Sequence, residues 1–337
     1  MKKIITFGEI PLRLSTNLGE RLYQAKQLNL NYGGAEANVA VSLSNYGYEV
    51  YVVSKVPDNP LGKAVERHLR SYGVHTDYLL KGGERLGTYY LETGVGERSA
   101  RVIYDRKYSS ISGLTKEELD FDKIFKHTDL FHVTGITPAL SMNLKDITLL
   151  FLKKAKERGV LTSFDFNYRS LLWSHEEAAQ TIKEYLPYVD ICSCGELDAL
   201  YLLGIEPAEH SLQREEKLMY YYKKIQEMYP NINYMCSTFR DVRSSSANTL
   251  QGNFYTNGRL YQSKVHHIEP IVDRVGGGDA FISGIIYGIL EKMNPEETVS
   301  FATGASALKH TVHGDCNAFS KDEIMAFIEK GSGKIIR

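Results

Sequence analysis

Cysteine is scarce in this sequence of 337 residues, and charge of one sign is not in excess. The four cysteines, Cys192, Cys194, Cys236 and Cys316, lack the paired Cys-x-x-Cys spacing of a zinc site, and three lie in apolar, strand-like runs. We therefore interpret them as reduced thiols in the core. Lysine and arginine total 40 against 41 aspartates and glutamates, so nothing favours nucleic acid or an anionic membrane as partner. A small-molecule partner is the remaining expectation.

Long apolar runs are missing as well. The first residues, MKKIITFGEI, carry two lysines, but Gly8 and Glu9 interrupt the apolar stretch that a signal peptide requires. The longest apolar helix candidate, Ala280 to Leu290, is about half the length of a membrane span. We therefore expect a soluble, cytoplasmic protein.

Two common nucleotide-binding fingerprints are absent. A dinucleotide-binding protein carries GxGxxG directly after its first strand, where this sequence reads FGEIPLRLS. The GVG at 94–96 is followed by ERSARVIY, which is typical of a hairpin. No Walker-type P-loop occurs either. These absences argue against a dehydrogenase and against a Walker-type NTPase.

Apolar, β-branched runs alternate with segments of helical periodicity, which predicts βαβ units and a mostly parallel sheet. The predicted strands are Ile4 to Glu9, Val50 to Val56, Leu130 to Gly135, Leu161 to Asn167, Val189 to Cys194 and Ile232 to Ser237. The predicted helices include Ala35 to Tyr46, Leu61 to Tyr72, Leu144 to Arg158 and Glu176 to Leu186. In such sheets the ligand lies beyond the carboxyl ends of the strands.

Two regions interrupt this alternation. Residues 86–106 read as two strands, TYYLET and ARVIYDR, around a Gly-rich turn, which predicts an antiparallel flap over the main sheet. Residues 250–265 predict a second hairpin around Asn257 and Gly258, a pair typical of a type I′ turn. Because no linker or repeat separates these regions, we expect one domain over residues 1–337.

The stretch VDRVGGGDAFISGIIYGIL, residues 272–290, places three glycines and Asp279 ahead of an apolar helix. Glycines before a helix let backbone N–H groups face an anion, and the helix N-terminus adds partial positive charge. Asp279 is either a helix cap or a catalytic base that removes a hydroxyl proton beside this anion hole. The stretch alone leaves both interpretations open.

A second glycine pair occurs in NYGGAEANVAVSLSNYG, residues 31–47. Gly33 and Gly34 precede a predicted helix that carries Glu36 and Asn38 in its first turn. The glycines would let a ligand approach the backbone, and Asn38 can both donate and accept hydrogen bonds to a polyol. An ordinary loop before a capped helix is the alternative.

These two stretches resemble the two signatures of the PfkB, or ribokinase-like, family of carbohydrate kinases. The family's GG-x-x-x-N and G-x-GD patterns are both present and in the family's order, and DNPLGKAVERHLRSYGVHTDYL at 58–79 is similar too. The resemblance implies a ribokinase-like three-layer α/β/α fold with a mostly parallel sheet. It also implies a small β-sheet lid, formed by about 10–34 and 86–110, and ATP-dependent phosphorylation of an alcohol group.

Three further stretches are similar to the 2-keto-3-deoxygluconate kinase branch, which forms the 6-phosphate: GGAEANVA at 33–40, RVIYDR at 101–106 and FDFNYRSLLW at 164–173. Recognition of a sugar acid requires arginine or clustered hydroxyl donors for the carboxylate. A neutral sugar, phosphorylated by a fructokinase or ribokinase, is the alternative substrate.

The lid and the strand LTSFDFN supply such groups. Tyr104 and Arg106 are two residues apart, so both should project from one face of the hairpin, with Tyr90 on the partner strand. Arg169 follows LTSFDFN at its carboxyl end. Packing is the alternative for each tyrosine, and a salt bridge to Asp165 is the alternative for Arg169.

The resemblance implies a role for each matching residue. Asp279 would deprotonate the primary hydroxyl, and Gly276, Gly277 and Gly278 would form the anion hole. The substrate-binding set would be Gly33, Gly34, Asn38, Tyr90, Tyr104, Arg106, Arg169, Asp279 and Asp315. The nucleotide-binding set would be Asn167, Tyr168, Arg169, Gly195, Glu196, Thr238, Gly276 and Gly278. For Asp315, in TVHGDCNAF, a simple turn is the alternative.

Mg²⁺ is implied because a divalent ion neutralises charge on a transferring phosphoryl group. The sequence shows no dedicated set of metal ligands, so the phosphates would hold the ion. A monovalent cation is compatible with the family pattern.

Two stretches depart from that pattern. In CSCGELDAL, Gly195 replaces the usual asparagine and Asp198 the usual glutamate of a magnesium and phosphate contact. Where a Gly-rich nucleotide loop usually follows the next strand, the sequence reads STFRDVRSSSANTLQG, residues 237–252. Two interpretations of this stretch remain open: Arg240 or Arg243 supplies positive charge there, or the loop is enlarged and the nucleotide base binds in a different position. The sequence alone assigns no specific role to these residues.

Two broader expectations follow. A catalytically silent sugar-binding protein on the same scaffold is the alternative to a kinase, although binding alone needs no base next to the glycines. The flap, rich in Tyr and Leu, has an open strand edge, which favours a homodimer formed through the lid.

Overall fold

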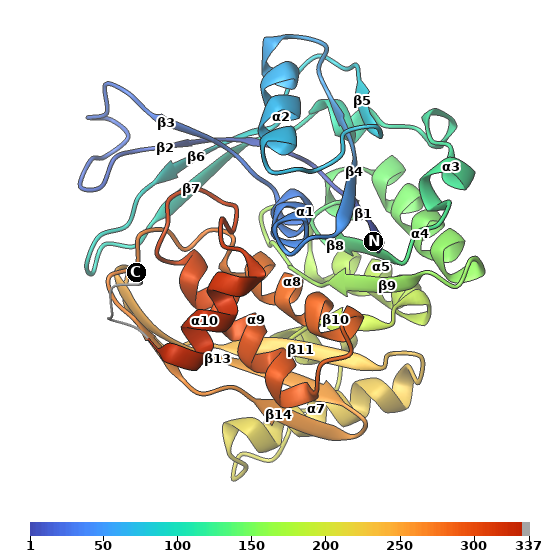
Figure 1. Cartoon of the computed structure of the whole chain (residues 1–337), viewed down its shortest axis with the longest axis vertical. Coiled ribbons are helices and arrows are strands. Elements are labelled where there is room, and N and C mark those ends of the chain that lie inside the picture. The colour runs from blue at the N-terminus through green and yellow to red at the C-terminus, as the bar shows by residue number, and fades with distance from the viewer. Residues whose placement is uncertain (332–337) are drawn as a thin grey trace.

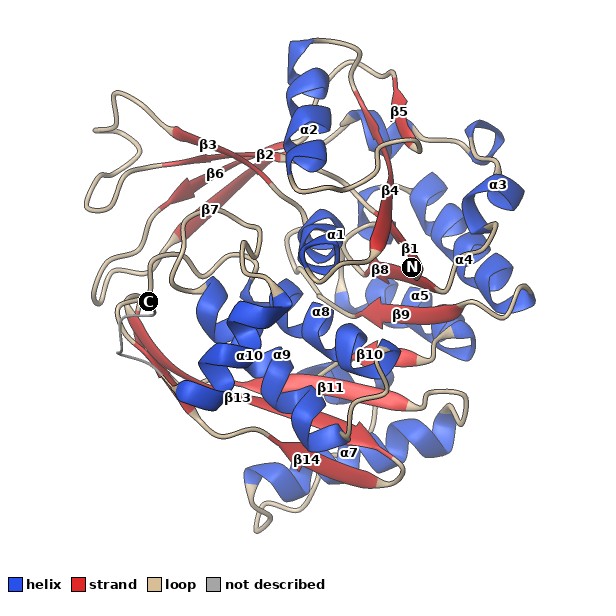
Figure 2. Ribbon diagram, viewed as in Figure 1, coloured by secondary structure: helices blue, strands red, loops and turns tan. Residues whose placement is uncertain are grey.

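The computed structural model describes residues 1–331 and consists of one large sheet between two helical layers, plus a small separate sheet (Figures 1 and 2). The large sheet has the strand order β12-β13-β11-β10-β9-β8-β1-β4-β5, with β14 and β15 paired to β13. Its strands are β1 (Lys3–Phe7), β4 (Glu49–Val56), β5 (Leu79–Lys81), β8 (Leu130–Thr134), β9 (Leu161–Asp165), β10 (Ile191–Ser193), β11 (Tyr234–Phe239), β12 (Val242–Ser244), β13 (Ala247–Thr256), β14 (Arg259–Gln262) and β15 (His266–Ile268). Strands β5 to β11 in that order are parallel, which confirms the predicted fold class.

Helices cover both faces of this sheet because its strands are apolar on both sides. Ile5 and Phe7 of β1 lie in one core with Phe151 and Tyr222, whereas Ile4 lies in a second core on the opposite face. The first core is covered by α3 (Phe121–Phe125), α4 (Met142–Glu157), α5 (His175–Tyr185) and α7 (Arg214–Met228). The second core is covered by α1 (Ala35–Asn45), α2 (Pro60–Ser71), α8 (Gly277–Leu290), α9 (Pro295–Lys309) and α10 (Lys321–Lys330). The short helix α6 (Glu196–Asp198) follows β10. None of the described helices is long and apolar enough to span a membrane.

The small sheet extends from the main body as an arm, on the left in Figure 1, and we call it the lid. Its strand order is β3-β2-β6-β7, built from β2 (Leu12–Ser15), β3 (Asn29–Tyr32), β6 (Thr88–Glu92) and β7 (Arg101–Asp105). The β6–β7 pair is the predicted antiparallel hairpin, while β2 pairs with β6 in parallel. The lid strands therefore come from two segments that the sequence separates by α1, β4, α2 and β5.

The second predicted hairpin is also present, between β13 and β14. Its turn residues Asn257 and Gly258 have φ angles of 51° and 74°. Positive φ at both central residues is the requirement of a type I′ turn, so this turn prediction is confirmed. The hairpin extends the large sheet, since β13 pairs antiparallel with β11.

Candidate active site

A cavity of about 1020 Å³ lies between the lid and the carboxyl ends of the parallel strands. From the lid come Tyr89, Val102, Tyr104 and Arg106. The ends of the parallel strands and the segments after them contribute 167–169, 193–198 and 237–240. The loop before α8 and the first turn of α8 contribute 274–276, 278 and 279. Segments far apart in sequence thus meet at the edge where open α/β sheets bind ligands.

Asp279 lies inside the first turn of α8, because the helix begins at Gly277 and its N-cap is Gly276. The interpretation of Asp279 as the helix cap is therefore wrong. Gly276 has a φ of 83°, and a Cβ on it would lie 1.8 Å from the backbone oxygen of Asp315. Only glycine is compatible with this backbone. Gly278, by contrast, has no atom near its Cβ direction and lines the cavity.

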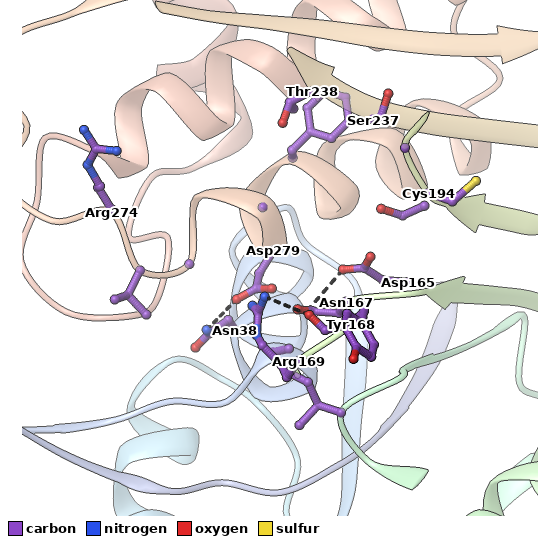
Figure 3. Close-up of a pocket in the computed structure, with 18 of the residues that line it drawn as sticks. Asn38, Asp165, Asn167, Tyr168, Arg169, Cys194, Ser237, Thr238, Arg274 and Asp279 are labelled. Carbon is purple, nitrogen blue, oxygen red and sulfur yellow. Dashed lines mark hydrogen bonds between the residues drawn. The ribbon is translucent and has the colours of Figure 1, made fainter. Parts of the chain in front are cut away.

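Asn38 holds the carboxylate of Asp279 (Figure 3). The amide Nδ2 of this buried residue donates to Asp279 Oδ2 at 2.7 Å, which joins α1 to α8. Desolvation by burial raises the pKa of Asp279 to about 6, although the hydrogen bond from Asn38 and the charge of Arg169 lower it. A carboxyl group with a pKa near 6 is ionised at neutral pH but remains a stronger base than an exposed aspartate.

Asp165, at the end of β9, is a second carboxylate in the cavity (Figure 3). Burial raises its pKa to about 7, and the negative charge of Asp279 adds to this shift. Its Oδ2 accepts a hydrogen bond from Asn167 Nδ2 at 3.3 Å. Within residues 1–331 Arg169 forms no ion pair, so the predicted alternative of a salt bridge to Asp165 is not observed.

The glycine pair before α1 also lies at this site. Gly34 lines the cavity with a φ of 113°, and a Cβ on it would approach the backbone oxygen of Glu9 to 2.2 Å. Glu36, in the first turn of α1, accepts hydrogen bonds through Oε1 from the backbone N–H and Oγ1 of Thr134 and from Oγ1 of Thr137. These bonds fix the start of α1 against the end of β8.

The lid presents one row of side chains to the cavity and the next row to the outside. Arg13, Tyr89 and Tyr104 are register partners across β2, β6 and β7, and Tyr89 and Tyr104 line the cavity. Tyr90 is the partner of Leu14 and Ile103 and points the other way. The prediction that Tyr90 faces the substrate is therefore wrong, because successive residues of a strand alternate between faces. Tyr89 occupies that position.

Arg106 lies where it was predicted but is already paired. Its Nε donates to Glu9 Oε2 at 2.7 Å, and its guanidinium stands 5.5 Å from the centre of the Tyr104 ring. Both Arg106 and Glu9 line the cavity. A ligand carboxylate at Arg106 would therefore share the guanidinium with Glu9, whereas Arg169 has no such competitor in the described structure.

A buried charge network connects the lid to the glycine segment. Arg13 of β2 pairs with Asp273 and, through Nη1, with Asp315 Oδ1 at 2.8 Å. Burial alone would disfavour its charge, but Asp315 and Asp273 hold the pKa of Arg13 above its usual value. The Tyr89 hydroxyl donates to Asp315 Oδ2 at 2.7 Å, and the fully buried Lys309 donates to the backbone oxygen of Asp273 at 3.3 Å.

On the other side of the cavity, the segments after β9, β10 and β11 place polar groups where a nucleotide would extend. Asn167 has a φ of 39°, and the backbone N–H of Gly195 donates to Asp198 Oδ2 at 2.8 Å. Thr238 lies near the end of β11, opposite the start of α8 (Figure 3). Burial raises the pKa of Asp198, while the backbone N–H of Gly195 and the charge of Arg169 lower it.

Comparison with known proteins identifies the family of this chain. The model of the pfkB family carbohydrate kinases matches residues 1–322. The chain belongs to the PfkB family of carbohydrate kinases. The predicted family and enzyme class are thereby confirmed.

Three relatives of this PfkB kinase are named as kinases of sugar acids. It is 32% identical over 335 residues to a 2-dehydro-3-deoxygalactonokinase of Haloferax volcanii, and the match covers 99% of each chain. It is 28% identical over 324 residues to a 2-dehydro-3-deoxygluconokinase of Bacillus subtilis, covering 96% of this chain and 94% of that protein. The crystal structure of 2-dehydro-3-deoxygluconokinase from Thermotoga maritima shares 40% identity with a TM-score of 0.94, covering 97% of this chain and 99% of that one.

Most of the predicted site residues of this PfkB kinase lie in the one cavity. Cavity-lining residues are Gly34, Asn38, Tyr104, Arg106, Asn167, Tyr168, Arg169, Gly195, Glu196, Thr238, Gly276, Gly278, Asp279 and Asp315. Three predicted residues do not line it: Tyr90, Gly33 and Gly277. Gly33 packs on Asp315, since a Cβ on it would lie 2.4 Å from Oδ2, and Gly277 packs on His310 in the same way, at 2.5 Å from Cε1. Both glycines therefore lie outside the cavity and allow the segments that line it to pack closely on Asp315 and His310.

Sequence reasoning missed several cavity and network residues: Arg13, Tyr89, Asp165, Asp273 and Arg274. The tyrosine pair in TYYLET was a signal for Tyr89, because Tyr89 and Tyr90 are adjacent and their side chains differ only in the face of the strand from which they project. Asp165 was considered only as a partner for Arg169. Arg13 lies in the segment 10–34 that the family resemblance assigns to the lid, but no motif singles it out.

Proposed function

We propose that this PfkB kinase transfers the γ-phosphoryl group of ATP to the primary hydroxyl of 2-keto-3-deoxygluconate and forms the 6-phosphate. The observation that carries the proposal is that Asp279, the glycine segment beside it and two arginines, Arg106 and Arg169, line one cavity under the lid. A base, an anion hole and groups for a carboxylate are the components that this reaction requires.

Asp279 acts as the base in this proposal. Its carboxylate removes the proton of the primary hydroxyl, and the resulting alkoxide oxygen attacks the γ-phosphorus. The hydrogen bond from Asn38 fixes the orientation of the carboxylate. Because the pKa of Asp279 is raised to about 6, its ionised form predominates at pH 7 and accepts the proton readily.

The start of α8 stabilises the transferring phosphoryl group. The first backbone N–H groups of a helix have no partner within the helix, and Gly276 and Gly278 leave them unobstructed toward the cavity. Gly277 lies between these two glycines but does not line the cavity: its N–H donates to the backbone oxygen of Arg274 at 3.4 Å, and a Cβ on it would meet His310. Charge that develops on the phosphoryl oxygens would be stabilised by groups already in place.

The sugar acid would lie under the inner row of the lid. Arg169 and Arg106 bind its carboxylate, Tyr89 and Tyr104 cover its carbon chain, and Gly34, Asn38 and Asp315 line the remaining cavity. The named activities of the relatives include both the gluconate and the galactonate epimers. We propose the gluconate form because the kinase with this name in Thermotoga maritima shares 40% identity.

ATP would occupy the side of the cavity formed by Asn167, Tyr168, Gly195, Glu196 and Thr238. Among the described residues no group of three or more His, Cys, Asp or Glu side chains could hold a metal ion. Mg²⁺ usually retains several waters and binds through one or two carboxylates and the phosphates, so Asp165 and Asp198 fit such an ion. When bound, Mg²⁺ would neutralise charge on the phosphates.

A panel of acceptors tests the substrate. Initial rates with ATP should be highest for 2-keto-3-deoxygluconate, lower for its galactonate epimer, and at least about tenfold lower for fructose and ribose, because their binding leaves the arginines without a carboxylate. A preference for fructose or ribose would identify the alternative, a neutral-sugar kinase. Arg169→Met should remove most of the preference for sugar acids.

Asp279→Asn separates a kinase from a silent sugar-binding protein. The variant should release ADP about 10² to 10⁴ times more slowly than the natural protein and still bind the sugar acid, since the amide keeps the shape but not the base. Full activity in this variant would contradict the proposed mechanism.

A further inference from the structure

Besides Arg169, which the proposed function assigns to the sugar acid, two arginines at the cavity have no carboxylate partner. Arg240 directly follows β11, and Arg274 precedes the glycine segment by two residues; both line the cavity. Neither forms an ion pair with a carboxylate in the described part of the chain, residues 1–331. Arg106 and Arg214 line the same cavity and are paired with Glu9 and Asp241. Unlike Arg106 and Arg214, Arg240 and Arg274 therefore carry a charge that no carboxylate of the described residues balances.

Arg274 is held in place by neutral groups. Its Nε donates to the backbone oxygen of Ser245 at 3.3 Å, and its Nη2 donates to the backbone oxygen of Ser244. Backbone carbonyls orient a guanidinium without neutralising its charge. The side chain is therefore fixed while its positive charge remains available at the cavity (Figure 3).

Arg240 lies in an unfavourable environment for an isolated cation. Its Nε is buried and has no acceptor among the described residues. Burial lowers the pKa of Arg240, and the positive charge of Arg274 lowers it further. Two like charges within range of each other, without a counter-charge, are stabilised when an anion binds between them.

The pair lies at the phosphate end of the cavity. His310 packs under Gly277, and the charges of Arg240 and Arg274 add to burial in lowering its pKa to about 4. His310 is therefore neutral near pH 7 and does not compete for an anion. The two guanidiniums thus stand close to the first turn of α8, on the side of the unusual segment 237–252.

We propose that Arg240 and Arg274 form a binding site for the phosphate groups of the nucleotide next to the one that is transferred. This inference rests on the proposed kinase function. Guanidinium groups match the oxygens of a phosphate and reach it through long side chains, so the backbone after β11 need not approach closely. This would explain how segment 237–252 serves a nucleotide without a glycine-rich sequence.

The site is tested with the variants Arg240→Met and Arg274→Met. Their affinities for ADP and AMP are measured by calorimetry without sugar and compared with those of the natural protein. Each variant should weaken ADP binding about 10- to 100-fold, the effect expected for loss of a hydrogen bond to a charged group, and weaken AMP binding less. The KM for ATP should rise by a similar factor, while the KM for the sugar acid should stay within about twofold. Arg240→Lys should restore part of the affinity.

Arg243→Met is the matched control, because Arg243 lies in the same segment but is exposed and does not line the cavity. Its ADP affinity should equal that of the natural protein. Arg274→Met removes two hydrogen bonds to the 244–245 backbone, so its thermal melting must be measured to show that the variant folds. If Arg274→Met does not fold, Arg240→Met alone tests the site, because Arg240 makes no side-chain hydrogen bond among the described residues.

The outcomes separate this inference from the proposed function. Unchanged ADP affinity in Arg240→Met would overturn the phosphate site even if the panel shows sugar-acid kinase activity. A rise in the sugar-acid KM alone would overturn it too and would assign the arginines to the sugar. Weakened ADP binding with no activity toward any sugar acid would support the phosphate site and contradict the proposed substrate.

Discussion

At the scale of single residues, the raised pKa of Asp279 has opposite consequences for activity and for stability. A carboxyl group whose pKa rises from 3.8 to about 6 on folding binds more protons in the folded state than in the unfolded state between these values. Stability therefore decreases as the pH rises through this range. Near pH 7 the ionised carboxylate lowers the free energy of unfolding, and this is the form that the reaction requires.

Two measurements follow for Asp279. The value of kcat/KM should fall about tenfold per pH unit below pH 6, because protonated Asp279 cannot act as the base. Asp279→Asn should melt at pH 7 at the same temperature as the natural protein or a higher one, since its amide carries no charge and still accepts the hydrogen bond from Asn38. A clearly lower melting temperature would show that the carboxylate stabilises the fold.

Gly276 and Gly278 allow a paired test of the anion hole. Gly276→Ala should lower the free energy of unfolding by about 2–4 kcal/mol, because its φ is 83° and the new Cβ would meet the backbone of Asp315. Gly278→Ala should leave the melting temperature unchanged, since no atom lies near its Cβ, but should reduce kcat more than tenfold by placing a methyl group where the phosphoryl group binds. Normal activity of Gly278→Ala would place the phosphate elsewhere.

At the scale of elements, Arg13 connects lid strand β2 to the loop before α8 through Asp273 and Asp315. Arg13→Met would leave two buried carboxylates without their main counter-charge, so we expect about 3–5 kcal/mol of destabilisation at pH 7. The difference from the natural protein should shrink as the pH falls, because the pKa of Asp315 is already raised by burial and the acid becomes neutral. Urea titrations at two pH values measure this.

Arg21→Met is a suitable comparison for Arg13→Met. Arg21 also belongs to the lid segment and pairs with Glu92 at 2.8 Å, but its side chain is 41% exposed. Glu92 is buried, but without Arg21 it still has Arg98 at 3.3 Å and the backbone N–H of Leu22 at 2.9 Å as partners, so the loss should be much smaller than in Arg13→Met and change little with pH. Equal losses in the two variants would show that burial of the Arg13 network has no special effect.

At the scale of the whole molecule, the outer row of the lid supports the proposed homodimer. Leu30, Leu14, Tyr90 and Ile103 are register partners across all four lid strands and form an apolar row on the face opposite the cavity. Leu30 and Ile103 are 60% and 48% exposed in the single chain. A second copy of the chain would cover this row, which exposed strands usually require.

Light scattering tests the dimer. Ile103→Asp places a charge at the β7 end of the apolar row and should convert a dimer to a monomer at micromolar concentration. Tyr108→Asp is the control, because Tyr108 is 86% exposed and follows the lid strands. A monomeric natural protein would contradict the proposal.

Much of the architecture could be predicted because the apolar runs of the parallel strands and the helical periodicity between them are strong local signals. The two glycine-containing stretches likewise identified residues that meet in one cavity. The face of the lid could not be predicted, because Tyr89 and Tyr90 are adjacent and only the pairing with β2 and β7 decides which one points inward. The Arg13 network was missed because its partners, Asp273 and Asp315, lie about 260 and 300 residues away in sequence.

The tip of the lid also touches the main body. The backbone N–H of Ser245 donates to the oxygen of Gly96 at 2.7 Å, Ser245 Oγ donates to the oxygen of Arg98 at 2.8 Å, and the N–H of Gly96 donates to Ser246 Oγ at 3.3 Å. At about 1 kcal/mol each, these three bonds would hold the lid closed, so that fewer than roughly one molecule in a hundred has it open. Substrate binding and product release would then require this rare open state. Removing one of these contacts, for example with Ser245→Gly, should therefore speed the exchange of ligands and weaken their affinity.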